Sequence, residues 1–139
     1  MTELWVVVPA YQEEARIGGV LRALAGQRDL GFTLVVADNG STDGTGRIAR
    51  EFAARAPFPV HVVDEPEKGV GCAVDTAVRF AIDRGARFVA RTDADCLPRP
   101  GWTAAARGAL EGGAAMVCGR IDARADEHGP LGRAGFRAM

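Results

Sequence analysis

The chain has 139 residues, of which 47% are hydrophobic and 25% are charged, and its formal net charge is −1. This size and balance are typical of one globular domain, which we expect to span residues 1–139. The near-zero net charge provides no field that would attract nucleic acid or an acidic membrane surface, so neither is an expected direct partner. No apolar stretch approaches the roughly 20 residues that a membrane-spanning helix needs.

The first half of the sequence predicts two strands, each followed by a helix. Residues 4–8 form a Val-rich run that is too short for a helix, and they predict a buried strand. Apolar positions between 17 and 24 recur at helical spacing and predict a helix. Residues 32–37 predict a second strand, and a second helix includes residues 48–52.

The second half continues this alternation. Residues 60–63 predict a third strand, and the helix after it has an apolar stripe formed by Val74, Val78, Ala81 and Ile82. The later elements are a fourth strand, an Ala-rich helix, a fifth strand and an irregular tail, at residues 88–92, 102–110, 114–118 and 120–139. Apolar strands that alternate with amphipathic helices indicate an α/β fold with a mainly parallel sheet covered on both faces.

Polar and acidic residues follow each of the first four predicted strands. The segments concerned are residues 9–14, 38–44, 64–69 and 93–96. Ligands of an open parallel sheet bind outside the carboxyl ends of its strands. We therefore expect the four loops to meet at one rim and to form a single binding site.

The pair Asp93 and Asp95 predicts a metal site at this rim. Two carboxylates one residue apart, directly after a buried strand, can face the same oxygen-rich site. Mg²⁺ in proteins is bound by one or two carboxylates together with substrate phosphates. The alternative is that Asp95 caps the following turn and that Asp93 forms only local hydrogen bonds.

Two further residues have a functional and a purely structural interpretation. Asp38 lies at a strand end, where a carboxylate can accept hydrogen bonds from a base or a ribose. Its segment also consists of residue types that favour turns and helix caps, so a purely structural role is the alternative. Lys68 precedes a predicted helix start and could contact a phosphate there, or it could be an ordinary solvated lysine. No P-loop is present, and Gly69 and Gly71 lack the third glycine of a dinucleotide fingerprint.

Together these segments closely resemble glycosyltransferase family 2. The matching segments are VVVPAYQEE at residues 6–14, VADNGSTDGT at 36–45, KG at 68–69 and TDAD at 92–95. The family has the GT-A fold, a Rossmann-like three-layer α/β sandwich. Its members transfer a sugar from a nucleotide-diphosphate donor, usually a UDP-sugar and sometimes a GDP-sugar, to an acceptor hydroxyl with inversion.

The resemblance implies roles for individual residues. Four residues would line the nucleoside pocket: Pro9, Ala10, Tyr11 and Glu13. Asp38 would contact the base. Asp93 would lie by the ribose and the metal, and Asp95 would bind the Mg²⁺ or Mn²⁺ that bridges the diphosphate. The complete set of residues that we expect to contact the nucleotide sugar is Pro9, Ala10, Tyr11, Glu13, Asp38, Gly40, Ser41, Lys68, Asp93 and Ala94.

The sequence departs from the family pattern at two points. The family usually has Asn where Gln12 stands, so the amide is kept with one methylene more. The family's catalytic base lies on a segment beyond the fifth strand, and no residue of this sequence matches it. We therefore assign no base and expect the chain either to be part of a longer protein or to be unable to turn over alone.

Three other functions stay open at this point. The chain could be a non-catalytic module that binds a nucleotide sugar, because the donor-binding loops are present and no catalytic base is found. A sugar-phosphate nucleotidylyltransferase shares the fold type, but its Gly-rich, Arg-containing loop is replaced by residues 9–11 here. A phosphatase could use Asp93 as its nucleophile.

The cysteines indicate the expected cellular location. Cys72, Cys96 and Cys118 form no CxxC pair, so we expect buried thiols in a reducing cytoplasm. The acceptor is unknown, and a lipid acceptor would place the protein peripherally at the inner face of the membrane.

Overall fold

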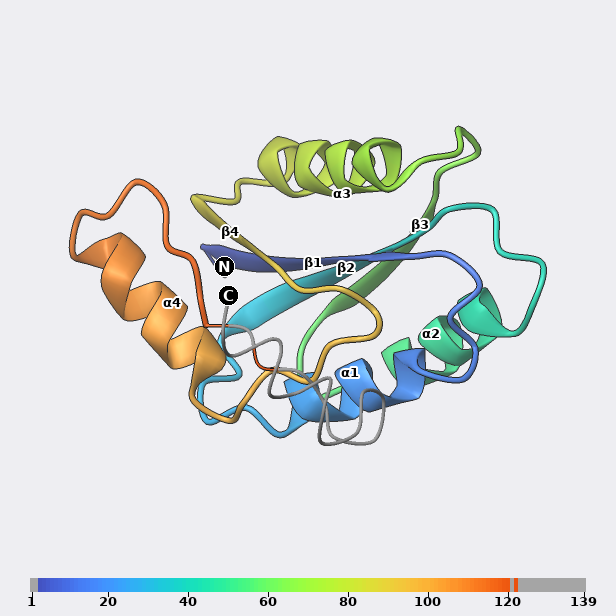
Figure 1. The fold of residues 1–139 in the computed structure, drawn as a ribbon. Coiled ribbons are helices and arrows are strands. Elements are labelled where there is room, and N and C mark those ends of the chain that lie inside the picture. The colour runs from blue at the N-terminus through green and yellow to red at the C-terminus, as the bar shows by residue number, and fades with distance from the viewer. Residues whose placement is uncertain (1–2, 121, 123–139) are drawn as a thin grey trace.

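The computed structural model describes residues 3–120 and 122 and has a parallel sheet between two helical layers (Figure 1). The strands β1–β4 are Leu4–Ala10, Phe32–Asp38, Val60–Asp64 and Phe88–Arg91. The helices α1–α4 are Ile17–Ala25, Thr45–Ala53, Val70–Asp83 and Trp102–Glu111. The strand order is β3-β2-β1-β4, and each neighbouring pair is parallel.

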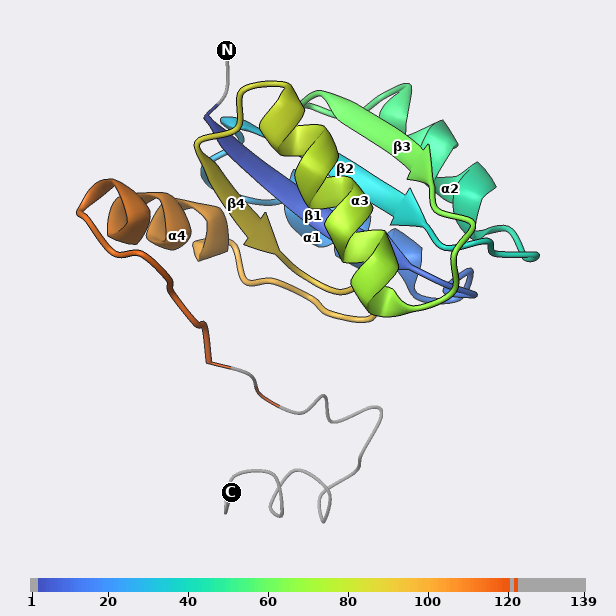
Figure 2. The ribbon, with the colours of Figure 1, turned by 90° about the horizontal axis from the view of Figure 1, so that it is seen from above.

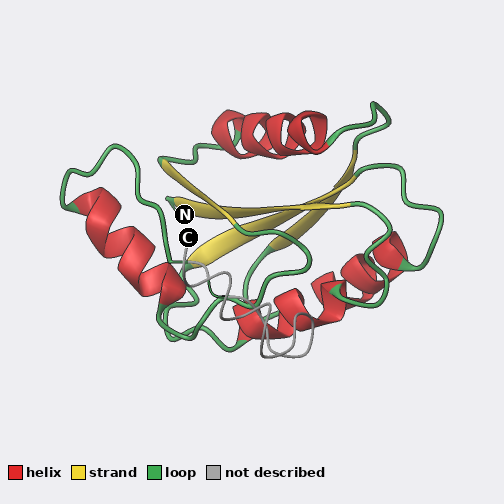
Figure 3. Ribbon diagram, in the orientation of Figure 1, coloured by secondary structure: helices red, strands yellow, loops and turns green. Residues whose placement is uncertain are grey.

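The sheet separates two hydrophobic cores. Helix α3 covers one face, while α1 and α2 cover the other, and α4 lies beside the edge strand β4 (Figures 1 and 3). Viewed from above, α3 runs across the middle of the sheet (Figure 2). The predicted α/β fold with a covered parallel sheet is therefore confirmed.

The central strands are buried along their whole length because both of their faces are covered. In β1 and β2, Val6 and Leu34 belong to the core under α1 and α2, whereas Val7 and Val35 belong to the core under α3. Successive strand residues point to opposite faces. A strand packed on both faces must therefore be apolar at every position, which accounts for the two continuous runs in the sequence.

The buried face of helix α3 overlaps the predicted stripe only at Ala81 and at the partly buried Val78. The fully buried residues of the helix are Ala73, Ala77 and Ala81, whereas Ile82 is 57% exposed. The prediction chose the larger aliphatic side chains, but the alanines bring the helix backbone close to the sheet. Close approach of the two layers decided which face is buried.

The predicted fifth strand does not form. Residues 114–118 have no regular structure, and Met116 is 81% exposed. A strand needs a hydrogen-bonding neighbour, and in the described part of the chain β4 has β1 as its only strand partner. Apolar composition alone could not reveal that the partner was absent. The predicted tail at 120–139 lies, apart from residues 120 and 122, outside the described residues.

The structure also bears on the expected burial of the cysteines and on membrane-spanning helices. The prediction of buried thiols is wrong, because Cys96 and Cys118 are exposed and Cys72 is only half-buried. Among the described helices, none has the length and apolar character required to cross a bilayer.

An aromatic cluster under α3 makes the stability of the domain pH-dependent. The His61 ring stacks on Trp5 with centroids 5.7 Å apart and lies 5.1 Å from the Phe80 ring, which Arg84 covers. Burial, followed by the charge of Arg84, lowers the pKa of His61 below its ordinary value of 6.5. The unfolded chain therefore binds the proton more readily than the folded one.

We expect the free energy of unfolding to decrease as the pH falls through the ordinary His range. Urea unfolding at about pH 7.5 and about pH 5.5 measures this loss, and His61→Phe, which keeps an aromatic ring, should show a smaller loss. Equal losses in the two proteins would contradict the assignment to His61.

Candidate functional site

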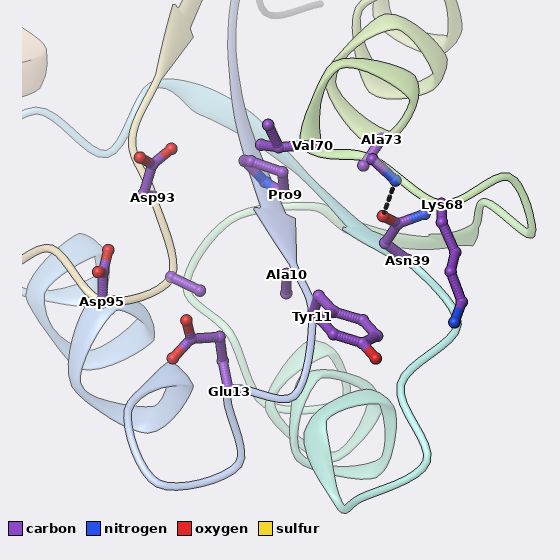
Figure 4. Close-up of a pocket in the computed structure, with 12 residues that line it drawn as sticks. Pro9, Ala10, Tyr11, Glu13, Asn39, Lys68, Val70, Ala73, Asp93 and Asp95 are labelled. Atoms are coloured by element: carbon purple, nitrogen blue, oxygen red, sulfur yellow. Dashed lines mark hydrogen bonds between the residues drawn. The ribbon is translucent and has the colours of Figure 1, made fainter.

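A cavity of about 380 Å³ lies at the carboxyl ends of the strands (Figure 4). The register aligns Ala10 with Asp38, and Asp38 with Asp64, so the loops that leave β1, β2 and β3 start side by side. The cavity is lined by Pro9, Ala10, Tyr11, Glu13, Asn39, Lys68, Gly69, Val70, Ala73, Asp93, Ala94 and Asp95. All four predicted loops contribute to it, so the expected convergence at one rim is found.

The two ends of the cavity differ in chemistry. Tyr11, Asn39 and Lys68 lie toward one end, and Glu13, Asp93 and Asp95 lie toward the other (Figure 4). Tyr11 is 51% exposed and offers an aromatic face to a planar ligand. The cavity can thus hold a molecule with an aromatic part at one end and anionic groups near a cation at the other.

Glu13, Asp93 and Asp95 form what we call the acidic corner. One ligand atom each from Asp93, Asp95 and Cys96 lie within 4.8 Å of one another. Two carboxylates at this separation suit a hard divalent cation whose remaining ligands come from phosphate and water. The donor set therefore fits Mg²⁺ or Mn²⁺.

Arginines face both of the predicted metal ligands. Arg91 Nε donates to Asp93 Oδ1 at 3.0 Å, and Arg16 Nη1 lies 4.0 Å from Asp95 Oδ2. These guanidinium groups offset part of the repulsion between the carboxylates. Each of the two candidate metal ligands therefore has a basic side chain close to it.

Glu13 lines the cavity as predicted, but its carboxylate faces the acidic corner and not the aromatic end (Figure 4). Burial raises the pKa of Glu13, and the charges of Asp95, Asp43 and Asp93 raise it further, while Arg16 opposes them. Its place beside the candidate metal ligands differs from the nucleoside contact that the resemblance implies.

Asp38 does not line the cavity. Its side chain is buried on the α2 side, where Oδ1 accepts a hydrogen bond from the Ser41 backbone N–H at 3.0 Å. A Cβ placed on Gly46 of α2 would lie 2.6 Å from Asp38 Oδ2, so the glycine permits this close approach. Gly40 and Ser41 are likewise absent from the cavity lining.

Asn39, the residue after Asp38, lines the cavity. Its Nδ2 donates to the carbonyl oxygens of Glu65 at 2.9 Å and Glu67 at 2.7 Å, and its Oδ1 accepts from Gly69 N–H at 3.0 Å. Asn39 therefore holds the loop that presents Lys68. Gly69 has a φ of 132°, which side chains rarely tolerate, and this lets the loop turn directly into α3.

Strand alternation could have identified Asn39. Val35 and Ala37 point to the α3 side of the sheet, and continuing this alternation places residue 39 on the same side. The cavity lies there, beside the start of α3. The base contact expected of Asp38 comes from the family resemblance, which does not specify the face of the sheet on which each side chain lies.

The segment that leaves Asp95 is fixed at its far end to the loop that follows α1. Buried Gln27 donates from Nε2 to the Arg99 carbonyl at 2.7 Å and accepts at Oε1 from the Thr103 N–H at 3.0 Å. Arg28 N–H also donates to the Pro100 carbonyl at 2.9 Å. The loop with Asp93 and Asp95 is therefore held both by β4 and by the segment after α1, which the sequence did not indicate.

Comparison with known proteins decides the family. Residues 5–137 match the family model described as Glycosyl transferase family 2. The chain belongs to glycosyltransferase family 2. Glycosyltransferase AglE of Haloferax volcanii is 28% identical over 120 residues, which cover 84% of this chain and 38% of AglE.

Two solved structures of glycosyltransferases share the fold. A structure of Staphylococcus aureus TarS in complex with UDP is 28% identical with a TM-score of 0.68 and covers 80% of this chain and 32% of TarS. The mannosyltransferase PcManGT from Pyrobaculum calidifontis, in complex with GDP-Man and Mn²⁺, is 33% identical with a TM-score of 0.62 and covers 71% of this chain and 29% of PcManGT. The GT-A fold is thus confirmed, and the chain spans well under two thirds of each relative.

Proposed function

We propose that the chain forms the donor site of an inverting, metal-assisted glycosyltransferase and binds a nucleotide-diphosphate sugar, with a UDP-sugar favoured. The single observation that carries this proposal is one cavity that joins an aromatic end to an acidic corner with two candidate metal ligands. The UDP in the TarS structure and the GDP-Man and Mn²⁺ in the PcManGT structure support the same class of ligand.

Each part of the cavity has a task in this proposal. Pro9 and Tyr11 provide apolar and aromatic surface for the nucleoside. Lys68 and the N-terminus of α3 attract the negative charge of a phosphate. Asp93 and Asp95 hold the divalent cation, which when bound would neutralise charge on the departing diphosphate.

The proposal leaves the acceptor and the catalytic base unassigned. A binding module without turnover has the same donor loops, so the two functions differ only in whether the donor is consumed. The family match argues against the nucleotidylyltransferase and the phosphatase. A cytoplasmic location, with a lipid acceptor at the inner face of the membrane, stays a prediction.

A thermal-shift titration tests the ligand class directly. UDP with Mn²⁺ is expected to raise the Tm, because a ligand at 100 times its Kd stabilises the native state by about 2.7 kcal/mol. GDP provides the base comparison, and EDTA should remove most of the shift. The proposal fails if neither UDP nor GDP raises the Tm in the presence of Mn²⁺ or Mg²⁺. Release of free sugar from a UDP-sugar would separate an enzyme from a binding module.

A further inference from the structure

Gln12 has an unusual backbone conformation beside the cavity. Its φ is 51°, and among the described residues it is the only residue other than glycine with a positive φ. A left-handed conformation is unfavourable for a residue with a Cβ, and it persists only where surrounding contacts over-determine it. Gln12 is exposed, so core packing does not supply these contacts.

The contacts come instead from the loop that follows β2. Gln12 Oε1 accepts from the Thr42 N–H at 2.6 Å and from the Asp43 N–H at 3.3 Å, and Nε2 donates to Thr42 Oγ1 at 3.0 Å. The Gln12 backbone N–H also donates to Ser41 Oγ at 3.0 Å. One residue therefore joins two loops about 30 residues apart in sequence, through both its side chain and its backbone.

The length of the side chain matters for this connection. The Oε1 atom reaches two successive backbone N–H groups while Nε2 of the same amide meets a hydroxyl. An Asn at this position would carry the same amide one methylene closer to its own backbone. It could not keep all of these hydrogen bonds without moving one loop toward the other.

The residues on either side of Gln12 serve opposite ends of the cavity. Tyr11 lies at the aromatic end, and Glu13 faces the acidic corner (Figure 4). The Glu13 backbone N–H is itself tied to Thr45 Oγ1 at 2.9 Å. A change in the backbone at residue 12 would therefore alter both ends of the cavity together.

We propose that Gln12 is a positioning residue that locks the 9–14 and 38–44 loops into one wall and thereby orients Tyr11 and Glu13 toward a bound nucleoside diphosphate. Gln12 is absent from the cavity lining and acts through its neighbours. The identity of the ligand in this inference rests on the proposed function. The hydrogen bonds by which Gln12 joins the two loops are present without any ligand.

Hydrogen exchange tests the lock without a ligand. In the wild-type protein the amides of Thr42 and Asp43 should be protected, and in Gln12→Ala they should exchange at least about tenfold faster, while amides in the middle of α1 keep their rates. Glu51→Gln, an exposed change on α2, is the matched control and should leave all of these rates unchanged. Unchanged exchange of Thr42 and Asp43 in Gln12→Ala would overturn the inference.

Calorimetry with UDP and Mn²⁺ then tests the consequence for binding. Gln12→Gly relieves the backbone strain, so its Tm should stay close to the wild-type value while its affinity for UDP falls roughly tenfold. Gln12→Asn should lose affinity to a similar extent because its amide is too short. An affinity that merely follows the Tm across these variants, or wild-type affinity in Gln12→Asn, would overturn the positioning role.

The two proposals can fail separately. If the wild-type protein shows no affinity for UDP or GDP with Mn²⁺, the proposed function fails, and hydrogen exchange alone then decides whether the lock exists. If the wild-type protein binds and Gln12→Gly binds equally well, the proposed function stands and the role of Gln12 is refuted.

Discussion

Asp95→Ala is expected to weaken Mn²⁺-dependent binding of UDP by about 100-fold or more. In the proposed function, the substitution removes a carboxylate that would coordinate the cation beside the diphosphate. Asp95 is one of the three carboxylates of the acidic corner, and its ligand atom lies within 4.8 Å of those of Asp93 and Cys96. Without Asp95, this group of clustered ligand atoms would keep only the Asp93 carboxylate and the Cys96 thiol, a poorer set for a hard cation. Calorimetric titration of UDP with Mn²⁺ and with EDTA measures the effect.

The control for this variant is Asp75→Ala. Asp75 is exposed on α3 and forms an ion pair with Arg79 at 2.8 Å, outside the cavity lining. Its removal takes away a carboxylate of the same type and should leave affinity for UDP unchanged. If Asp95→Ala instead lowered the Tm and kept Mn²⁺-dependent affinity, Asp95 would be a turn-capping residue, which is the alternative that its sequence context allows.

Asn39→Ala is expected to lower the free energy of unfolding by about 3 kcal/mol, since each of the three side-chain hydrogen bonds contributes on the order of 1 kcal/mol and the residue is buried. The carbonyls of Glu65 and Glu67 and the N–H of Gly69 would all lose their partner. The loop that carries Lys68 would then be released, so affinity for UDP should fall as well. Urea unfolding at neutral pH measures the loss of stability.

Two variants make the test of Asn39 specific. Asn39→Asp keeps the shape but cannot donate to two carbonyl oxygens, so it should be no more stable than Asn39→Ala. Ser41→Ala, in the same loop, removes a single acceptor of the Gln12 N–H and should cost about 1 kcal/mol or less. A loss below about 1 kcal/mol in Asn39→Ala would mean that water replaces the amide and that the loop does not depend on it.

The different positions of Asp38 and Asn39 show which details of the site the sequence can predict and which it cannot. The motif placed polar residues at the end of β2, and the cavity is indeed found there. The motif does not specify which of two neighbouring side chains faces the cavity. Strand residues alternate between faces, and β2 ends at Asp38, so Asp38 lies on the α2 side while Asn39 lines the cavity.

Local sequence by itself determined the strands β1 and β2, the covered parallel sheet and the convergence of the loops, because continuous apolar runs and strand-end polar residues are properties of the chain. Tertiary structure alone decided the Ala-lined face of α3, the absence of a strand at 114–118 and the contacts of Gln12 and Gln27. Each of these depends on a partner distant in sequence: a sheet at close range, a neighbouring strand, or a loop that supplies hydrogen bonds. Such partners exist only once the chain has folded, so no local pattern records them.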